Sequence, residues 1–380
     1  METENSPHYV YVDSDAAAAA LAESLAGADR IAMDTEANGL HRYHQRICLI
    51  QLSFAGENYI VDPLADVDLG PILHQLANTP LIIHGVDFDL RMMRSTFGFV
   101  PNAPIFDTMI AGRLLGFERP GLSPLLGELF DIPICKAGQK SDWTRRPLDP
   151  AQLRYASDDT RWLEQLANAL AEQLEAAGRT HWAEQSTAAA IESAATDQPT
   201  DVANAWRIRG SVHLSPAQAA YLRELWAWRE RISQQADRPP FKIMPNALLT
   251  HLAIWGEKNP GKPIGREIKL PRHILGPRRS DLESAMADAH RLGPDQYPAP
   301  RLRKGPPAVR PGKKLPDLQQ GISKAAEELH LPASTVVPRA ALERLSRAPA
   351  TEIDEIVTNA EVLPWQAEIL QPIAQEIWTT

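Results

Sequence analysis

Two carboxylates stand close together in the stretch Arg30-Ile-Ala-Met-Asp34-Thr-Glu36-Ala-Asn38. Residues 31–36 have the composition of a β-strand, in which side chains two positions apart share a face, roughly 6.6 Å apart along the backbone. An isolated pair of this kind is usually solvated at a strand end. Here the preceding apolar residues indicate a buried strand, where two close carboxylates repel each other unless a cation or a proton intervenes. Such oxygen ligands favour Mg²⁺ or Mn²⁺ over zinc.

Two more strand-like runs follow, at residues 47–54 and 58–62, and the short connection between them contains glycine, as hairpins do. With residues 31–36 they predict an antiparallel meander. Helical and strand patterns alternate after it, with a helix near 71–77, a strand at 81–84 and a helix at 87–97. These patterns predict an α/β domain in which a mixed sheet is flanked by helices.

A second acidic position lies where a predicted strand gives way to a helix, in His84-Gly-Val-Asp87-Phe-Asp89. Asp87 suits the N-cap of that helix. Asp89 falls in the first turn, still near the strand end, and is the preferred candidate for the site. His84 is interpreted as a core histidine or as one that contacts the site residues without binding the metal.

A third acidic position lies on a helix that we expect to begin at Asp149-Pro150, with Asp as the N-cap and Pro at the first helical position. Tyr155 and Asp159 are four residues apart and share a face, whereas Asp158 is turned about 100° away. Taken alone, the pair is explained as well by a buried tyrosine hydroxyl bonded to a carboxylate. Taken with the other acids, Asp159 completes a set of four carboxylates.

Basic and aromatic residues are interleaved in Lys140-Ser-Asp-Trp143-Thr-Arg145-Arg146. A guanidinium can bind a phosphate through two hydrogen bonds, and an indole face can stack on a base. Lys140, Trp143, Arg145 and Arg146 are therefore candidates for RNA binding. A solvated loop around a buried tryptophan explains the block equally well.

The composition bounds the class of protein. With 380 residues the chain is long enough for two or three domains, and its net charge of -9 argues against coating nucleic acid through bulk charge. Cys48 and Cys135 form no metal or redox motif and are expected to be buried and inert. The N-terminal residues lack a signal-peptide pattern and no run approaches the ~18 apolar residues of a membrane span, so we expect a cytoplasmic protein without a membrane partner.

The catalytic domain is placed at residues 1–198. Its last helix is expected to run to Gly178, with an Ala- and Glu-rich continuation that ends at a polar boundary, residues 196–201. A compact helical domain follows at 206–291, and its aromatic anchors are Trp226, Trp228, Phe241 and Trp255.

Residues 293–314 contain six prolines and six basic residues, a composition that predicts an extended linker. The linker either contacts RNA through its basic residues or is a solvated spacer. Residues 315–380 return to helical periodicity and predict a second small helical module.

One string imitates a phosphate-binding loop. Gly256-Glu-Lys-Asn-Pro-Gly261-Lys262 has the glycine and lysine spacing, but Pro263 stands where a Ser or Thr would bind magnesium. We interpret the string as a turn. No histidine and cysteine spacing suits a zinc site, and no small-molecule cofactor is expected.

Together these motifs resemble the DEDD superfamily of 3′-to-5′ exonucleases in its tyrosine-containing branch, and most closely the ribonuclease D family. Asp34-Thr-Glu36 is similar to the first exonuclease motif, the segment from His84 to Asp89 to the second, and Tyr155-Ala-Ser-Asp-Asp159 to the third. The block that begins at Lys140 resembles a more specific family signature. Residues 214–252 resemble an HRDC domain, a helical nucleic-acid-binding module, and residues 315–380 resemble a diverged second copy.

The resemblance implies a ribonuclease H-like catalytic fold and removal of single nucleotides from RNA 3′ ends, typically those of tRNA precursors. Asp34, Glu36, Asp89 and Asp159 would then hold two divalent ions, Mg²⁺ or Mn²⁺, and Tyr155 would orient the attacking water. Two rival functions stay open. One is a DNA 3′-to-5′ exonuclease, because a contact to the 2′-hydroxyl cannot be identified in the sequence. The other is a non-catalytic RNA-binding scaffold.

Overall fold

The computed structural model describes residues 9–134, 138–196, 201–265, 267–299 and 312–379. The chain forms two compact units. The first contains Met1–Ala37, Arg46–Asp197 and Arg310–Thr380, and the second contains Asn38–Gln45 and Gln198–Val309. The domain boundaries expected from the sequence stay predictions, and most of the expected linker at 293–314 lies outside the described residues. Among the described helices, none combines the length and apolar character of a membrane-spanning segment.

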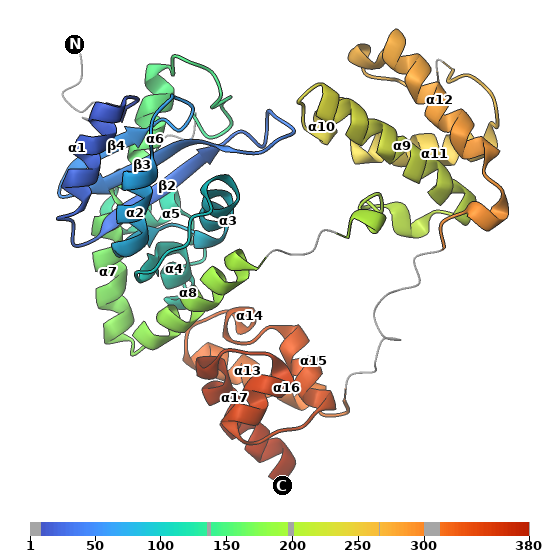
Figure 1. Ribbon diagram of the computed structural model, residues 1–380. Helices are drawn as coiled ribbons and strands as arrows, with labels where there is room; N and C mark the ends of the chain where they lie inside the picture. The colour runs from blue at the N-terminus through green and yellow to red at the C-terminus, as the bar shows by residue number, and fades with distance from the viewer. Residues whose placement is uncertain (1–8, 135–137, 197–200, 266, 300–311, 380) are drawn as a thin grey trace. The chain divides into compact units, whose positions relative to one another are not determined.

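A six-stranded mixed sheet forms the centre of the first unit (Figure 1). The three central strands are antiparallel neighbours, β2 (Ile31–Ala37), β3 (Ile47–Phe54) and β4 (Glu57–Val61), which confirms the predicted meander. Parallel strands extend the sheet on both sides, in the order β1-β4-β3-β2-β5-β6. They are β1 (Val10–Val12), β5 (Leu81–Ile83) and β6 (Ile105–Asp107), of which β5 was predicted and β1 and β6 were not.

The two faces of the sheet bury different helices. Ile31 and Met33 project to the face covered by α1 (Asp15–Leu25), α2 (Gly70–Asn78) and α3 (Val86–Phe97). The alternate side chains of β2, which include Asp34 and Glu36, project to the opposite face. Helix α6 (Pro150–Arg161) lies against that opposite face, where Ala156 packs on Leu49 and Ile60. The strand period therefore separates the apolar core from the acidic side chains.

The predicted long helix is three helices. Asp149 caps α6 as expected, accepting from the backbone N–H groups of Ala151 and Gln152, and the Gln152 side chain completes a capping box. The first break comes at Trp162, which ends α6 and precedes α7 (Leu163–Ala176). Gly178, with φ of 66°, follows α7, and α8 (Thr180–Ala195) continues the chain. Cys48 is buried as expected, whereas Cys135 lies outside the described residues.

The second unit is helical. Helix α9 (Pro216–Gln235) starts with a capping box made by Ser215 and Gln218, and it packs with α11 (Asn246–Lys258) and α12 (Pro277–Arg291). Of the expected aromatic anchors, Trp228 is buried and Trp226 and Trp255 are partly buried against the core. Phe241, on the short helix α10 (Pro240–Ile243), is exposed, so that expectation was wrong.

The C-terminal helices share a hydrophobic core with the catalytic part of the first unit. Trp365 stacks on Trp182 of α8 with ring centroids 4.6 Å apart, and its indole N–H donates to the Ser186 hydroxyl at 3.2 Å. Arg179 donates to the carbonyl oxygens of Leu114 and Leu329 at 2.7 and 2.6 Å. The helices involved are α13 (Leu315–Glu328), α14 (Ala333–Val336), α15 (Arg339–Arg347), α16 (Ile353–Ala360) and α17 (Pro364–Thr379), together with α4 (Thr108–Leu114), α5 (Leu122–Phe130), α7 and α8.

Replacing Trp365 by alanine tests this shared core. Because the indole is buried and stacked, we expect Trp365→Ala to lower the free energy of unfolding by about 3–5 kcal/mol. Thermal unfolding of the full chain, followed by scanning calorimetry, measures the loss. Glu368→Gln, an exposed change on the same helix, is the matched control and should melt like the wild type. A Trp365→Ala protein with unchanged melting would show that the packing contributes nothing.

Candidate active site

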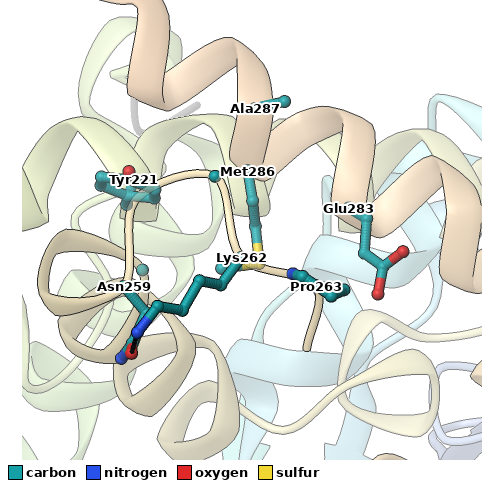
Figure 2. A pocket seen from close by; sticks show the side chains of 9 residues that line it. Tyr221, Asn259, Lys262, Pro263, Glu283, Met286 and Ala287 are labelled. Atoms are coloured by element: carbon teal, nitrogen blue, oxygen red, sulfur yellow. Dashed lines mark hydrogen bonds between the residues drawn. The ribbon is translucent and has the colours of Figure 1, made fainter. Parts of the chain in front are cut away.

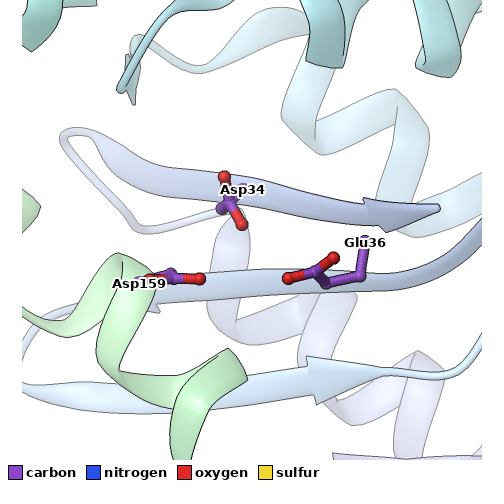
Figure 3. Close-up of side chains that lie close together, drawn as sticks. All are labelled: Asp34, Glu36 and Asp159. Atoms are coloured by element: carbon purple, nitrogen blue, oxygen red, sulfur yellow. The ribbon is translucent and has the colours of Figure 1, made fainter. Parts of the chain in front are cut away.

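Three carboxylates converge at one place in the first unit. Asp34 and Glu36 come from β2 and Asp159 comes from α6, and one potential ligand oxygen of each lies within 4.8 Å of the others (Figure 3). Asp34 and Glu36 meet because they are two residues apart on one strand, and Asp159 meets them because α6 packs on that face of the sheet. The sequence predicted that these three residues share one site, and in the structure they lie close together.

Asp89 approaches the same site from the first turn of α3. Its side chain is buried, and its Oδ1 accepts a hydrogen bond from the Thr35 hydroxyl at 2.5 Å. It is not one of the three clustered carboxylates, but its negative charge contributes to the raised pKa values of Asp34, Glu36 and Asp159. Asp87 is exposed and pairs with Arg91 at 2.6 Å, which agrees with the preference for Asp89.

The N-cap of α3 is a correction to the sequence interpretation. Gly85 takes that position in the left-handed conformation, with φ of 87°, so Asp87 is not the cap. The missing cap is supplied from β6: Asp107 accepts hydrogen bonds from the backbone N–H groups of Gly85 and Val86 at 3.1 and 2.8 Å. Asp107 also caps α4 by accepting from Met109 and Ile110. Its position before a helical run is the sequence signal that could have identified it as a cap.

Burial raises the pKa values of all four acids, and the charges of other acids of the site add to the rise for Asp34, Glu36 and Asp159. Burial is the largest cause in each case, and it raises the pKa of Glu36 to about 9 and those of Asp89 and Asp159 to about 7. The pKa of Asp34 is raised well above its ordinary value by burial and then by the charges of Asp89, Asp159 and Glu36. A site of this kind holds protons or cations, and an all-carboxylate donor set fits Mg²⁺ or Mn²⁺.

Tyr155 completes the cluster from α6. Its hydroxyl donates a hydrogen bond to Asp159, and its pKa is raised by burial and then by the charges of Asp159 and Glu36. The phenol therefore stays protonated at neutral pH and acts as a donor. Asp158, one residue before Asp159, instead lies 3.6 Å from Arg161 in an ion pair, as its different helical face predicts.

A cavity of about 400 Å³ opens over the carboxylates, and α5 contributes Leu122, Ser123 and Pro124 to its wall. His84 also lines it. The His84 Nδ1 lies 2.9 Å from the Thr108 hydroxyl, whose proton is donated to the Ile83 carbonyl oxygen. Burial lowers the pKa of His84 to about 4. His84 is a neutral, fixed residue that supports the site wall.

The candidate RNA-binding residues divide into two pairs. Trp143 is 1% exposed and packs under α6, so the expectation that its indole stacks on a base was wrong. Arg146 donates to Asp62 at 2.6 Å and to the carbonyl oxygens of Cys48 and Trp143, so its guanidinium holds the loop to the sheet and does not face a phosphate. Lys140 and Arg145 are exposed at the surface of the same block.

The string that imitates a phosphate loop lies in the second unit. Residues 256–258 end helix α11 and residues 259–261 form the turn after it, so the interpretation as a turn holds for only part of the string. A cavity of about 220 Å³ beside it is lined by Lys262, Asn259, Tyr221 and Glu283, among others (Figure 2). Glu283 pairs with Arg279 at 3.1 Å.

The raised pKa values predict how stability depends on pH when no divalent cation is present. The folded protein holds protons on Asp89, Asp159 and Glu36 above about pH 4, where an unfolded carboxylate loses them. The free energy of unfolding that these three protonated acids contribute is therefore fully present at acid pH. That contribution is lost as the pH rises through 7 and 9. We expect the melting temperature in EDTA to fall across this window and the fall to shrink in saturating Mn²⁺.

Thermal shift measurements in both conditions test this expectation, with Glu36→Gln as the control variant. Because it removes the acid whose pKa is about 9, Glu36→Gln should flatten the alkaline part of the curve in EDTA. A melting temperature that rises with pH in EDTA would contradict the assignment of raised pKa values.

Comparisons with known proteins agree with this geometry. The profile described as a 3'-5' exonuclease matches residues 9–175, and the HRDC domain profile matches residues 218–261. The ribonuclease D of Gluconacetobacter diazotrophicus is 31% identical over 330 residues, which cover 85% of this chain and 82% of the relative. The ribonuclease D of Pseudomonas paraeruginosa is 29% identical over 353 residues, 90% of each chain.

Among solved structures, the chain has the fold of Escherichia coli RNase D, an exoribonuclease involved in structured RNA processing. That structure has a TM-score of 0.66 and 24% sequence identity, and the match covers 97% of this chain and 99% of the other. The α/β exonuclease fold and the helical C-terminal region predicted from the sequence are confirmed. The chain therefore belongs to the ribonuclease D family of 3′-to-5′ exoribonucleases.

Proposed function

We propose that this exoribonuclease uses two divalent ions, Mg²⁺ or Mn²⁺, to remove single nucleotides from the 3′ ends of tRNA precursors. The observation that carries the proposal is the group formed by Asp34, Glu36 and Asp159, which are half-buried and have one ligand oxygen each within 4.8 Å of the others. Three like charges at this separation are stable only with protons or cations between them. Oxygen-only ligands favour Mg²⁺ and Mn²⁺ among the common divalent ions.

Two such ions, when bound, would supply the charge that activates a water and stabilises the leaving oxygen. The carboxylates divide the coordination among them. Asp34 would be shared by both ions, and Glu36 and Asp159 would hold the one next to the attacking water. Asp89, whose orientation is fixed by the Thr35 hydroxyl donating to it at 2.5 Å, would support the other ion.

Tyr155 orients the attacking water. Its hydroxyl already donates to Asp159, and its raised pKa excludes a phenolate that would serve as a strong base at neutral pH. The residue therefore contributes by position, holding the water in line with the scissile bond. The proton of that water leaves by a route other than the tyrosine.

Lys140 and Arg145 are the exposed cations of the block next to the site, and we assign them to the RNA backbone. Arg145 is 81% exposed and lies 3.8 Å from Asp142, a separation at which an exposed ion pair contributes little and can give way to a phosphate. The HRDC domain supplies a second contact to the RNA. We place the protein in the cytoplasm, where tRNA precursors are processed.

A degradation assay on a 3′-extended tRNA tests the proposed reaction. Asp34→Asn should lower the rate by about 1,000-fold or more, because the central carboxylate is lost while the fold is kept. Wild-type activity should require Mg²⁺ or Mn²⁺ and stop on addition of EDTA. Asp87→Asn, an exposed acid on α3 outside the site, is the matched control. Substantial activity in pure Asp34→Asn protein would remove Asp34 from the chemistry.

Tyr155→Phe separates orientation of the water from packing of the ring. The variant keeps the aromatic ring and loses only the hydroxyl that donates to Asp159, so we expect the catalytic rate to fall by about 100-fold with little change in RNA affinity. Single-turnover kinetics and RNA binding in Ca²⁺ measure the two quantities separately. An unchanged rate would leave Tyr155 with a packing role only.

A DNA 3′-to-5′ exonuclease is the competing function on the same fold. Matched RNA and DNA single strands with the same sequence, offered together, distinguish the two. Preferential loss of the DNA strand would overturn the assignment to RNA.

A further inference from the structure

Gln51 lies in the middle of β3 and is fully buried, with a relative exposure of 0%. Neither atom of its side-chain amide has a hydrogen-bond partner in the described part of the chain. A primary amide offers two N–H donors and one acceptor, and leaving them unpaired away from water is unfavourable. The mechanism proposed above gives this residue no role.

Asp34 stands directly opposite Gln51 on the neighbouring antiparallel strand. Residues in this relation project from the same face, with Cβ atoms about 4.5–5.5 Å apart. On its other side Gln51 is in register with Ile60 of β4, which has no polar side chain. Of the two residues in register with Gln51, only Asp34 can therefore accept a hydrogen bond from its side chain.

Other polar groups in this layer are already engaged. The Ser53 hydroxyl, two residues along β3, lies 2.7 Å from the Thr160 hydroxyl of α6 and 2.8 Å from Asn58 Oδ1. Asp62 accepts hydrogen bonds from Arg146 and from the Tyr11 hydroxyl. Asp34 accepts no side-chain hydrogen bond from the described residues and is the acceptor in register with Gln51.

The carboxylates of the site differ in how their orientation is fixed. The Thr35 hydroxyl donates to Asp89, and the Tyr155 hydroxyl donates to Asp159. Asp34 is stabilised by the Thr35 backbone N–H, and no side chain among the described residues donates to it. Carboxylates that bind metals are generally held by a further hydrogen bond. Among the described residues, Asp34 and Glu36 are thus the site carboxylates without a side-chain donor, and of these two it is Asp34 that stands directly opposite the unpaired Gln51 amide.

We propose that Gln51 is a positioning residue of the metal site, whose amide N–H donates to the Asp34 carboxylate when a divalent cation is bound. The inference rests on the proposed role of Asp34 as a metal ligand. The cation keeps Asp34 ionised and turns it into a strong acceptor, and the hydrogen bond then fixes the direction of its metal-binding oxygen. Gln51 touches neither the RNA nor the reacting atoms.

Gln51→Met in the full-length protein tests the proposal with two readouts. Methionine has nearly the shape of glutamine without its polar atoms, so removing an unpaired amide should leave the melting temperature in EDTA equal to or above that of the wild type. Titration calorimetry with Mn²⁺ alone should show affinity weakened by about 10-fold or more. If Gln51 had a merely structural role, Gln51→Met would lower the melting temperature in EDTA and leave the Mn²⁺ affinity unchanged.

Two further variants make the outcomes decisive. Ser157→Ala also removes a buried, unpartnered polar atom, but it is two residues from Asp159 on α6 and therefore points to another side, so its Mn²⁺ affinity should match the wild type. Asp34→Asn in the same titration tests the metal site separately from the role of Gln51. Unchanged Mn²⁺ binding in Asp34→Asn would overturn the metal site itself, whereas weakened binding there with unchanged binding in Gln51→Met would overturn only the role of Gln51.

Loss of stability is also an informative outcome. If Gln51→Met and Gln51→Leu both melt well below the wild type in EDTA, the amide is already satisfied without a cation, and the proposal is overturned.

Discussion

Electrostatic repulsion among buried carboxylates is the constraint on which the rest of this structure depends. Three different elements bring Asp34, Glu36, Asp89 and Asp159 close together, and the charges of Asp89 and Asp159 raise the pKa values of other acids in the group. A fold can hold such a cluster only if the surrounding backbone cannot relax. The central position of β2, between β3 and β5, supplies that rigidity for the first pair.

The remaining rigidity comes from polar residues with no place in the chemistry. Asp107 binds the backbone at the start of α3 and α4 and so holds the turn that carries Asp89. Arg146 and Asp62 hold the loop before α6, and the capping box of Asp149 and Gln152 fixes where that helix begins. The positions of Asp89 and Asp159 therefore depend on buried hydrogen bonds several residues away from them.

The features that were predicted correctly are those that depend on residues close together in the sequence. Alternation in β2 and the spacing of Tyr155 and Asp159 were sufficient to identify one face of a strand and one face of a helix, and the central meander followed from the hairpin between β3 and β4. The roles of Trp143 and Arg146 were misjudged because an aromatic or basic residue has the same letters whether it faces solvent or packs beneath a helix. Gln51 gave no signal in the sequence, because its importance lies in which side chain is opposite it, and the position of Asp107 before a helix could indicate the cap of α4 but not its bonds to the backbone of α3.

The stacking of Trp365 on Trp182 has a consequence for how the chain is made. The helices around Trp182 bury their apolar surface against residues that lie more than a hundred positions later, after all of the second unit. During synthesis the helices from α13 to α17 must therefore leave the ribosome before that surface is covered. Until then the emerging exonuclease exposes an apolar face, through which unfinished chains can associate with one another.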